Sequence, residues 1–164
     1  MKNMSYTDLV TESVNTYHKY LQKEMPEIAK LTSTILRVHG REHRELRDVH
    51  RLFNNTKTLL EQILIIEEVD IFPYIKLYDR KPSKEILDEI IQSLDELQKD
   101  YDEIEDNLKE LRKITNNYTA PEDGCATYDK TFEKLEEFEE KMKEHIHLEK
   151  DMLFGKIRKE EEQA

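Results

Sequence analysis

The stretch SKEILDEIIQSLDELQKDYDEIEDNLKEL, Ser83 to Leu111, determines the fold class predicted for this chain. Its apolar side chains recur at intervals of three and four residues, at Ile86, Ile90, Leu94, Leu97, Tyr101, Ile104, Leu108 and Leu111. This spacing places them on one face of an α-helix and leaves charged residues on the other. Ser83 can cap the helix, because its hydroxyl can accept a hydrogen bond from a free amide of the first turn. We therefore expect a long amphipathic helix that buries one face against other helices.

The same periodicity extends over the rest of the chain and is interrupted at few points. Ser5 or Thr7 can cap a first helix that runs to about Lys23, and Pro26 begins a short segment that ends at Gly40. The expected helices cover about residues 7–23, 26–40, 41–73, 83–114 and 127–154. The chain is therefore predicted to be all-α, an antiparallel up-and-down four-helix bundle with a short extra N-terminal helical segment.

Composition agrees with this prediction and limits the classes of function. The 164 residues suit a single domain, and three glycines, four prolines and 38% charged residues suit long helices with few turns. The net charge of −11 argues against nucleic acid as a partner, and no apolar run predicts a membrane span. A single cysteine indicates a reducing compartment, so we expect a cytoplasmic protein. Cys125 is expected to be a packing residue, and the charged tail, residues 155–164, is expected to fray.

Two ten-residue stretches with a shared pattern carry candidate metal ligands. HIHLEKDMLF (residues 145–154) aligns with ILIIEEVDIF (residues 63–72), so that their glutamates coincide and a histidine falls on an isoleucine. A histidine and a glutamate four residues apart share a helix face and can reach one ion. The candidate ligands are His18, Glu67, His145 and Glu149. This set suits iron or manganese, whereas spacing alone also fits surface histidines and ordinary salt bridges.

Four separated motifs carry a resemblance to a known family. They are YHKYLQKEMP, RVHGREHREL, TNNYTAPEDGCATY and HIHLEKDMLF, and the resemblance that they carry covers about residues 6–154. In this order they resemble the hemerythrin-like domain of the iron–sulfur cluster repair proteins, the repair-of-iron-centres family. The resemblance implies a four-helix bundle with a non-haem di-iron centre. It also implies a role in restoring iron–sulfur clusters damaged by nitric oxide or peroxide.

The resemblance assigns the family's ligands to positions of this chain, with two departures. The positions that match are His18, Glu67, His145 and Glu149, together with His39, which is the less certain ligand. Ile63 and Tyr101 stand where the family has histidines. An isoleucine cannot bind a metal, whereas a tyrosine can do so as phenolate. Three outcomes stay open: two irons with Tyr101 as a ligand, a single metal, or a centre that has been lost.

The function expected from these features is that of an iron-binding stress protein. By resemblance, it would donate iron to damaged iron–sulfur proteins and so assist their repair. Two alternatives remain at this point: a protein that binds or senses oxygen or nitric oxide, and a metal-free module that binds a partner. No glycine-rich phosphate loop and no Ser/His/Asp or Cys/His set indicates a conventional enzyme.

Overall fold

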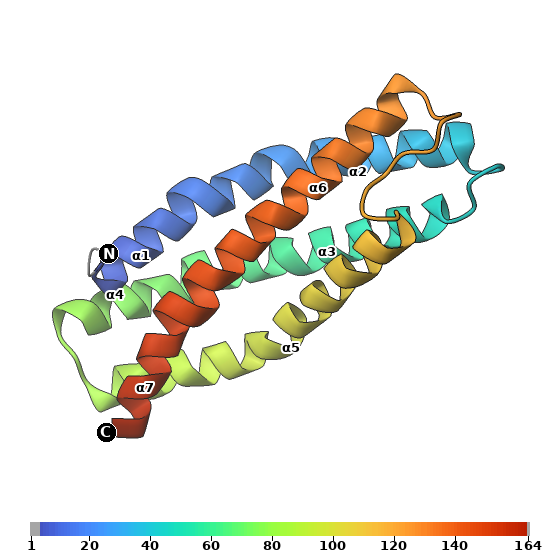
Figure 1. Ribbon diagram of the computed structural model, residues 1–164. Coiled ribbons are helices and arrows are strands. Elements are labelled where there is room, and N and C mark those ends of the chain that lie inside the picture. Colours follow the sequence, from blue (N-terminus) through green and yellow to red (C-terminus); the bar gives the residue numbers. More distant parts are fainter. Residues whose placement is uncertain (1–3, 164) are drawn as a thin grey trace.

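Four antiparallel helical rods form the molecule, which is described over residues 4–163 by a computed structural model (Figure 1). The first rod comprises α1 (Tyr6–Glu12), η1 (Ser13–His18) and α2 (Lys19–His39). The second comprises α3 (Leu46–Ile66), η2 (Glu67–Ile71) and α4 (Phe72–Arg80), and the third is α5 (Lys84–Ile114). The fourth comprises α6 (Ala126–Ile146), η3 (His147–Phe154) and α7 (Gly155–Gln163). The all-α four-helix bundle is confirmed.

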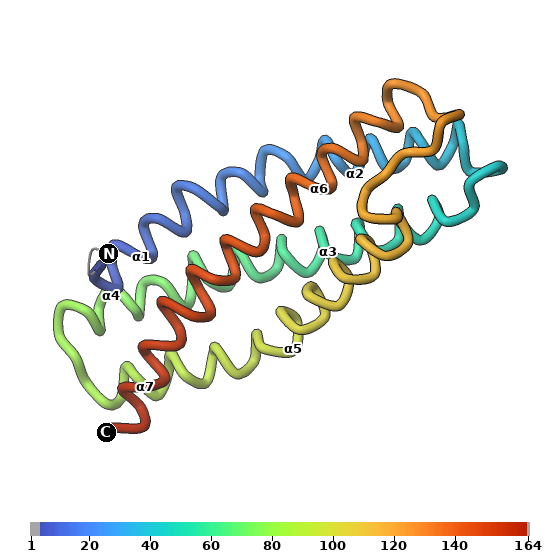
Figure 2. The backbone as a smooth tube through the Cα atoms, viewed as in Figure 1, coloured from blue at the N-terminus to red at the C-terminus, as the bar shows by residue number. Residues whose placement is uncertain are grey.

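The rods run alternately up and down, so α1 and α7 lie at the same end of the bundle (Figure 1). Residues 40–45 and the loop 115–125 lie together at the opposite end (Figure 2). Aliphatic and aromatic side chains fill the centre between the rods. Phe53 and Phe138, for example, pack edge to face with ring centroids 5.1 Å apart. No helix in the described part of the chain is both long and apolar enough to cross a membrane.

Helix starts follow the expected capping residues in the first and third rods. The Ser5 hydroxyl accepts a hydrogen bond of 3.0 Å from the Asp8 amide, and the Asp8 carboxylate accepts one of 3.2 Å from the Ser5 amide. The Ser83 hydroxyl accepts a bond of 3.2 Å from the Ile86 amide and starts α5. Along α5 the expected apolar face is buried, except that Ile86 is half-buried.

The expected break before Pro26 is wrong, because Pro26 lies inside α2. An interior proline lacks one helical hydrogen bond and costs about 3 kcal/mol or more. Its neighbours Met25 and Ile28 are almost fully buried, which stabilises the helix by about 1.5–3 kcal/mol for each side chain. Packing of the apolar face therefore offsets the local cost, and the first rod continues to His39.

The expectation that the tail frays is also wrong. Residues Gly155–Gln163 form α7, which continues the fourth rod. Ile157 is fully buried against the bundle, and Arg158 donates a hydrogen bond of 2.8 Å to Asp95 on α5. One buried side chain and one ion pair to a neighbouring helix thus hold a segment whose composition alone indicates an exposed end.

Three of the four rods contain a π-helical segment. In each, a backbone amide bonds to the carbonyl five residues earlier: Lys19 to Val14, Phe72 to Glu67, and Gly155 to Lys150. Each segment inserts the equivalent of one extra residue into the helix and so rotates the side chains that follow it. The segments contain His18, Glu67 and Glu149, so the helices deviate from α-geometry at candidate ligands. Short π segments are frequent at functional sites.

Candidate metal centre

His18, Glu67, His145 and Glu149 meet inside the bundle. One possible ligand atom from each lies within 4.8 Å of every other, and none of the four side chains is more than 1% exposed. His18 Nε2 lies 3.1 Å from Glu67 Oε1 and 3.2 Å from Glu149 Oε2. His145 Nε2 lies 2.7 Å from the same oxygen of Glu149. The structure thus brings together the four ligands that the aligned stretches and the first helix predict.

This donor set fits a divalent or trivalent metal ion. Metals bound by imidazole and carboxylate lie about 2.0–2.2 Å from each donor atom, so neighbouring donors of one ion are about 3–3.5 Å apart. The contacts of 2.7–3.2 Å between these donors are close to that spacing. Two imidazole nitrogens and two carboxylate oxygens suit iron, manganese or zinc. Buried ionisable groups at this density need either a metal or protons to balance their charge.

Tyr101 closes the other side of the two glutamates. It projects from α5, is 6% exposed, and its hydroxyl lies 2.5 Å from Glu67 Oε2 and 2.6 Å from Glu149 Oε1. The phenol therefore lies at the level of the candidate ligands, as the resemblance implies. A phenol has one proton to donate, so two such short contacts require a second proton on one of the carboxyls.

The metal-free group holds its protons unevenly. Burial, followed by the adjacent charge of Glu149, raises the pKa of Glu67 well above its ordinary value. Burial acts in the same direction on Glu149, but His145 and His18 outweigh it and hold the pKa of Glu149 well below its ordinary value. Burial by itself lowers the pKa of His18, but Glu149 and Glu67 outweigh it and raise that pKa to about 10. Without metal, protons are therefore favoured on Glu67 and His18 and disfavoured on Glu149.

Residues that the sequence analysis missed support the ligands. Glu68 accepts a hydrogen bond of 2.9 Å from His18 Nδ1, which leaves Nε2 facing the centre. The Ser13 hydroxyl donates to Glu149 Oε2. Tyr17 stacks on His145 with ring centroids 5.3 Å apart. Second contacts of this kind orient metal ligands. Among these three residues, only Ser13 could have been found from the sequence, because it is a small hydroxyl residue on the buried face of the first helix.

His145 has no equivalent support at its second nitrogen. Within residues 4–163, no polar atom lies within hydrogen-bond distance of its buried Nδ1. A buried polar nitrogen without a partner is costly, which is uncommon outside functional sites. The stacked ring of Tyr17 therefore has to hold the orientation of this imidazole, while Nε2 points towards Glu149.

The structure does not bring His39 to this group, which corrects the expectation that it lies close to the centre. His39 ends α2, a helix of 21 residues that begins directly after His18, so about 30 Å of helix separates the two. Its Nε2 lies 3.1 Å from Cys125 Sγ, at the end of the bundle that carries the loop 115–125 (Figure 2). Cys125 is exposed, so the expectation of a packing residue is also wrong.

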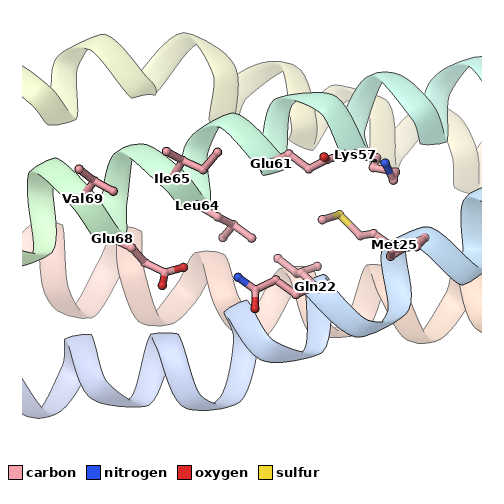
Figure 3. Close-up of a pocket in the computed structure, with 10 residues that line it drawn as sticks. Gln22, Met25, Lys57, Glu61, Leu64, Ile65, Glu68 and Val69 are labelled. Carbon is pink, nitrogen blue, oxygen red and sulfur yellow. Dashed lines mark hydrogen bonds and ion pairs between the residues drawn. The ribbon is translucent and has the colours of Figure 1, made fainter.

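A surface groove adjoins the centre between α2 and α3 (Figure 3). It has a volume of about 420 Å³. Glu68 lines this groove and also bonds His18, so one carboxylate connects the solvent-facing groove with a buried imidazole. The rest of the lining is mostly apolar and includes Leu21, Met25, Pro26, Leu64, Ile65 and Val69.

Comparison with known proteins assigns the family. Residues 9–157 match the family described as the hemerythrin HHE cation binding domain. The chain belongs to the hemerythrin family. The match covers all four candidate ligands and all three π-helical segments from Ser13 onwards. The resemblance inferred from the four sequence motifs is therefore confirmed.

Relatives of this hemerythrin-family chain carry names that refer to iron–sulfur clusters. The iron-sulfur cluster repair protein ScdA of Staphylococcus epidermidis is 26% identical over 159 residues, which cover 95% of this chain and 68% of that protein. The iron-sulfur cluster repair protein YtfE of Yersinia pseudotuberculosis is 26% identical over 148 residues, which cover 90% of this chain and 64% of that protein. The chain thus spans about two thirds of the length of these relatives.

Metal binding to this hemerythrin-family site should become tighter as the pH rises. A metal must displace the protons that Glu67 and His18 hold in the metal-free protein, because both pKa values are raised. Between about pH 6 and 8, affinity should therefore increase by up to about tenfold per pH unit for each proton released. Competition titrations with a chelator of known affinity, using anaerobic ferrous iron, measure this slope. An affinity that is flat over this range, after correction for the chelator, would contradict the assigned protonation.

Proposed function

We propose that this protein binds iron in the buried group and donates it to iron–sulfur clusters damaged by nitrosative or oxidative stress. The observation that carries the proposal is the convergence of two imidazoles and two carboxylates in the core of a hemerythrin-family chain. The names of its relatives support cluster repair as the process, and damaged iron–sulfur proteins as the partners. The cytoplasm, where such proteins are damaged and reduced thiols persist, is the proposed location.

Each residue of the group has a distinct part in this proposal. His18 and His145 anchor the ion through Nε2, while Glu67 and Glu149 neutralise its charge. Iron, when bound, is the metal that a damaged cluster has lost. Glu68 orients His18 and also lines the groove. A displacement of Glu68 at the groove can therefore loosen His18 without unfolding the core. Oxygen and nitrogen donors without a thiolate favour release of iron to the sulfur-rich site of a cluster protein.

Transfer of iron to a damaged cluster tests the proposal. A purified dehydratase whose [4Fe–4S] cluster has lost iron after exposure to peroxide or nitric oxide is mixed, without oxygen, with the iron-loaded protein. We expect recovery of dehydratase activity together with loss of iron from this protein, measured after the two are separated. A chelator that captures free ferrous iron is present throughout, so recovery reports transfer between proteins.

A matched pair of controls decides how the result is interpreted. Glu149→Gln removes a ligand and should restore no activity, whereas Glu140→Gln removes the same charge from an exposed position of α6 and should behave as wild type. Equal recovery with Glu149→Gln would overturn iron donation by this site. A reversible spectral change with oxygen or nitric oxide, without transfer, would instead favour the gas-binding alternative. A protein that stays metal-free after loading would favour the partner-binding alternative.

A further inference from the structure

The two buried glutamates present their four oxygens in two pairs that face different neighbours. Glu67 Oε1 and Glu149 Oε2 lie next to the imidazoles of His18 and His145, at 2.7–3.2 Å. Glu67 Oε2 and Glu149 Oε1 instead lie 2.5 Å and 2.6 Å from the phenol oxygen of Tyr101. A pair of carboxylates that bridges two ions gives one oxygen of each carboxylate to each ion. In this chain one such side has nitrogen donors, and the other has a phenol.

The phenol oxygen lies against the two carboxylate oxygens that a second ion would need. An ion shared by Glu67 Oε2 and Glu149 Oε1 would lie about 2.0–2.2 Å from both oxygens. The Tyr101 oxygen already lies within 2.6 Å of each of them. Contacts of this length are those of charge-assisted O–H···O hydrogen bonds. A phenol that is hydrogen-bonded to these two oxygens and a second ion therefore compete for the same place on the glutamates.

Packing holds the Tyr101 ring in this place. The cavity beside the ring, lined by Leu94, Leu97 and Phe154 among others, has a volume of only about 20 Å³. That space accepts about one water molecule and is far too small for a phenol ring to turn into. Tyr101 could leave the carboxylates only if α5 and its neighbours repacked, which is unfavourable in a close-packed core.

The position one helical turn before Glu67 offers no donor for a second ion. Ile63, one helical turn before Glu67, is fully buried and offers no ligand atom. The three rods that contribute candidate ligands contain π-helical segments at His18, Glu67 and Glu149, whereas α5 is a regular α-helix throughout residues Lys84–Ile114. The backbone is thus adapted to ligation at His18, Glu67 and Glu149, and it shows no such adaptation at Tyr101.

From this geometry we infer that the centre holds one metal ion, bound by His18, Glu67, His145 and Glu149. The Tyr101 phenol takes the place of a second ion and, as a positioning residue, lies against the outer oxygens of both glutamates and donates its one proton to them. Identification of the ion as iron rests on the proposed function, whereas the number of ions rests on the geometry alone. A single ion without a bridging partner has fewer bonds to break, which suits a site that delivers iron.

Metal content and the visible spectrum of the full chain test the inference. Wild-type protein is loaded anaerobically with excess ferrous iron, desalted, analysed for iron per chain, and then oxidised for spectroscopy. We expect one iron per chain, and no broad visible band from a ferric phenolate, because the phenol stays a hydrogen-bond donor. Two irons per chain, or such a band that disappears in Tyr101→Phe, would overturn the inference and leave the proposed function intact. No bound iron would overturn both.

Two variants test whether Tyr101 and Ile63 limit the number of ions. Tyr101→Phe should still bind one iron, with affinity reduced about 10- to 100-fold, because the outer oxygens of both glutamates lose their support. The double variant Ile63→His/Tyr101→His supplies two further imidazoles beside the glutamates and should bind two irons. If the double variant folds with wild-type helicity and still binds one iron, these two residues do not set the count, and the inference is wrong.

Discussion

Glu149→Gln should abolish metal binding while the bundle stays folded. Glu149 is the one residue of the group that contacts His18, His145, Tyr101 and Ser13 together. A neutral amide removes the negative charge that balances the metal and presents N–H donors where an acceptor is required. Loss of a supporting contact alone costs 10- to 100-fold in metal affinity, so loss of this ligand should exceed about 100-fold. Equilibrium dialysis with ferrous iron, read by metal analysis, measures the effect.

The exposed residue Glu140 on the same helix provides the control. Glu140→Gln changes the net charge of the protein by the same amount but leaves the centre untouched. Its affinity for ferrous iron should equal that of the wild type. Circular dichroism of both variants checks that the helices form. If Glu149→Gln kept iron with wild-type affinity, the buried group would not be the metal site.

Metal binding should raise the melting temperature of the wild type by roughly 5–15 °C. The unfolded chain has no preformed site, so an ion that binds the folded state at 100 to 1,000 times its dissociation constant adds about 2.7–4.1 kcal/mol of stability. For a protein of this size, each kcal/mol shifts the melting temperature by roughly 2–4 °C. Thermal unfolding followed by circular dichroism, with and without anaerobic ferrous iron, measures the shift.

The same experiment on Glu149→Gln separates specific from nonspecific stabilisation. This variant should melt at one temperature whether or not iron is present, because it cannot form the site. Addition of a strong chelator to the loaded wild type should return it to the melting temperature of the metal-free protein. A wild-type protein that is indifferent to saturating iron would show that the folded state binds none.

The buried group also explains why the metal-free protein should be the less stable form. Two carboxyls and two imidazoles lie in the core with at most 1% of each side chain exposed, and buried charged groups are costly even when they are paired. The Nδ1 atom of His145 remains without a partner in the described structure. Such costs are tolerated at functional sites and are compensated by packing elsewhere, here by an apolar core that extends along all four rods.

Local sequence patterns were sufficient for the fold class and for the candidate ligands. The three- and four-residue spacing from Ser83 to Leu111 depends only on helix geometry, so it predicts a helix and its buried face without knowledge of partners. Glu67 and Glu149 were identifiable because they interrupt apolar runs, and a charge on a buried face needs a partner. The absence of a histidine at position 63 is likewise visible in the sequence alone.

Tertiary packing decided the features that local rules got wrong. Pro26 indicates a helix break and the charged tail indicates a frayed end. Burial of Met25 and Ile28 keeps the first segment helical, and burial of Ile157 keeps the second helical. The π-helical segments could not be predicted from the periodicity of the sequence either. Inserting one residue into a helical turn is favourable only where the rotated side chains contact other helices.

The sequence by itself therefore determined an all-α bundle and four residues able to hold a metal. Only the tertiary structure decided that Glu68 orients His18, that Ser13 bonds Glu149, and that the Tyr101 phenol lies between the two glutamates. The physical reason is distance along the chain. Helical periodicity acts over a few residues, whereas these hydrogen bonds join residues 34 to 136 positions apart. Such contacts exist only after the four rods have packed.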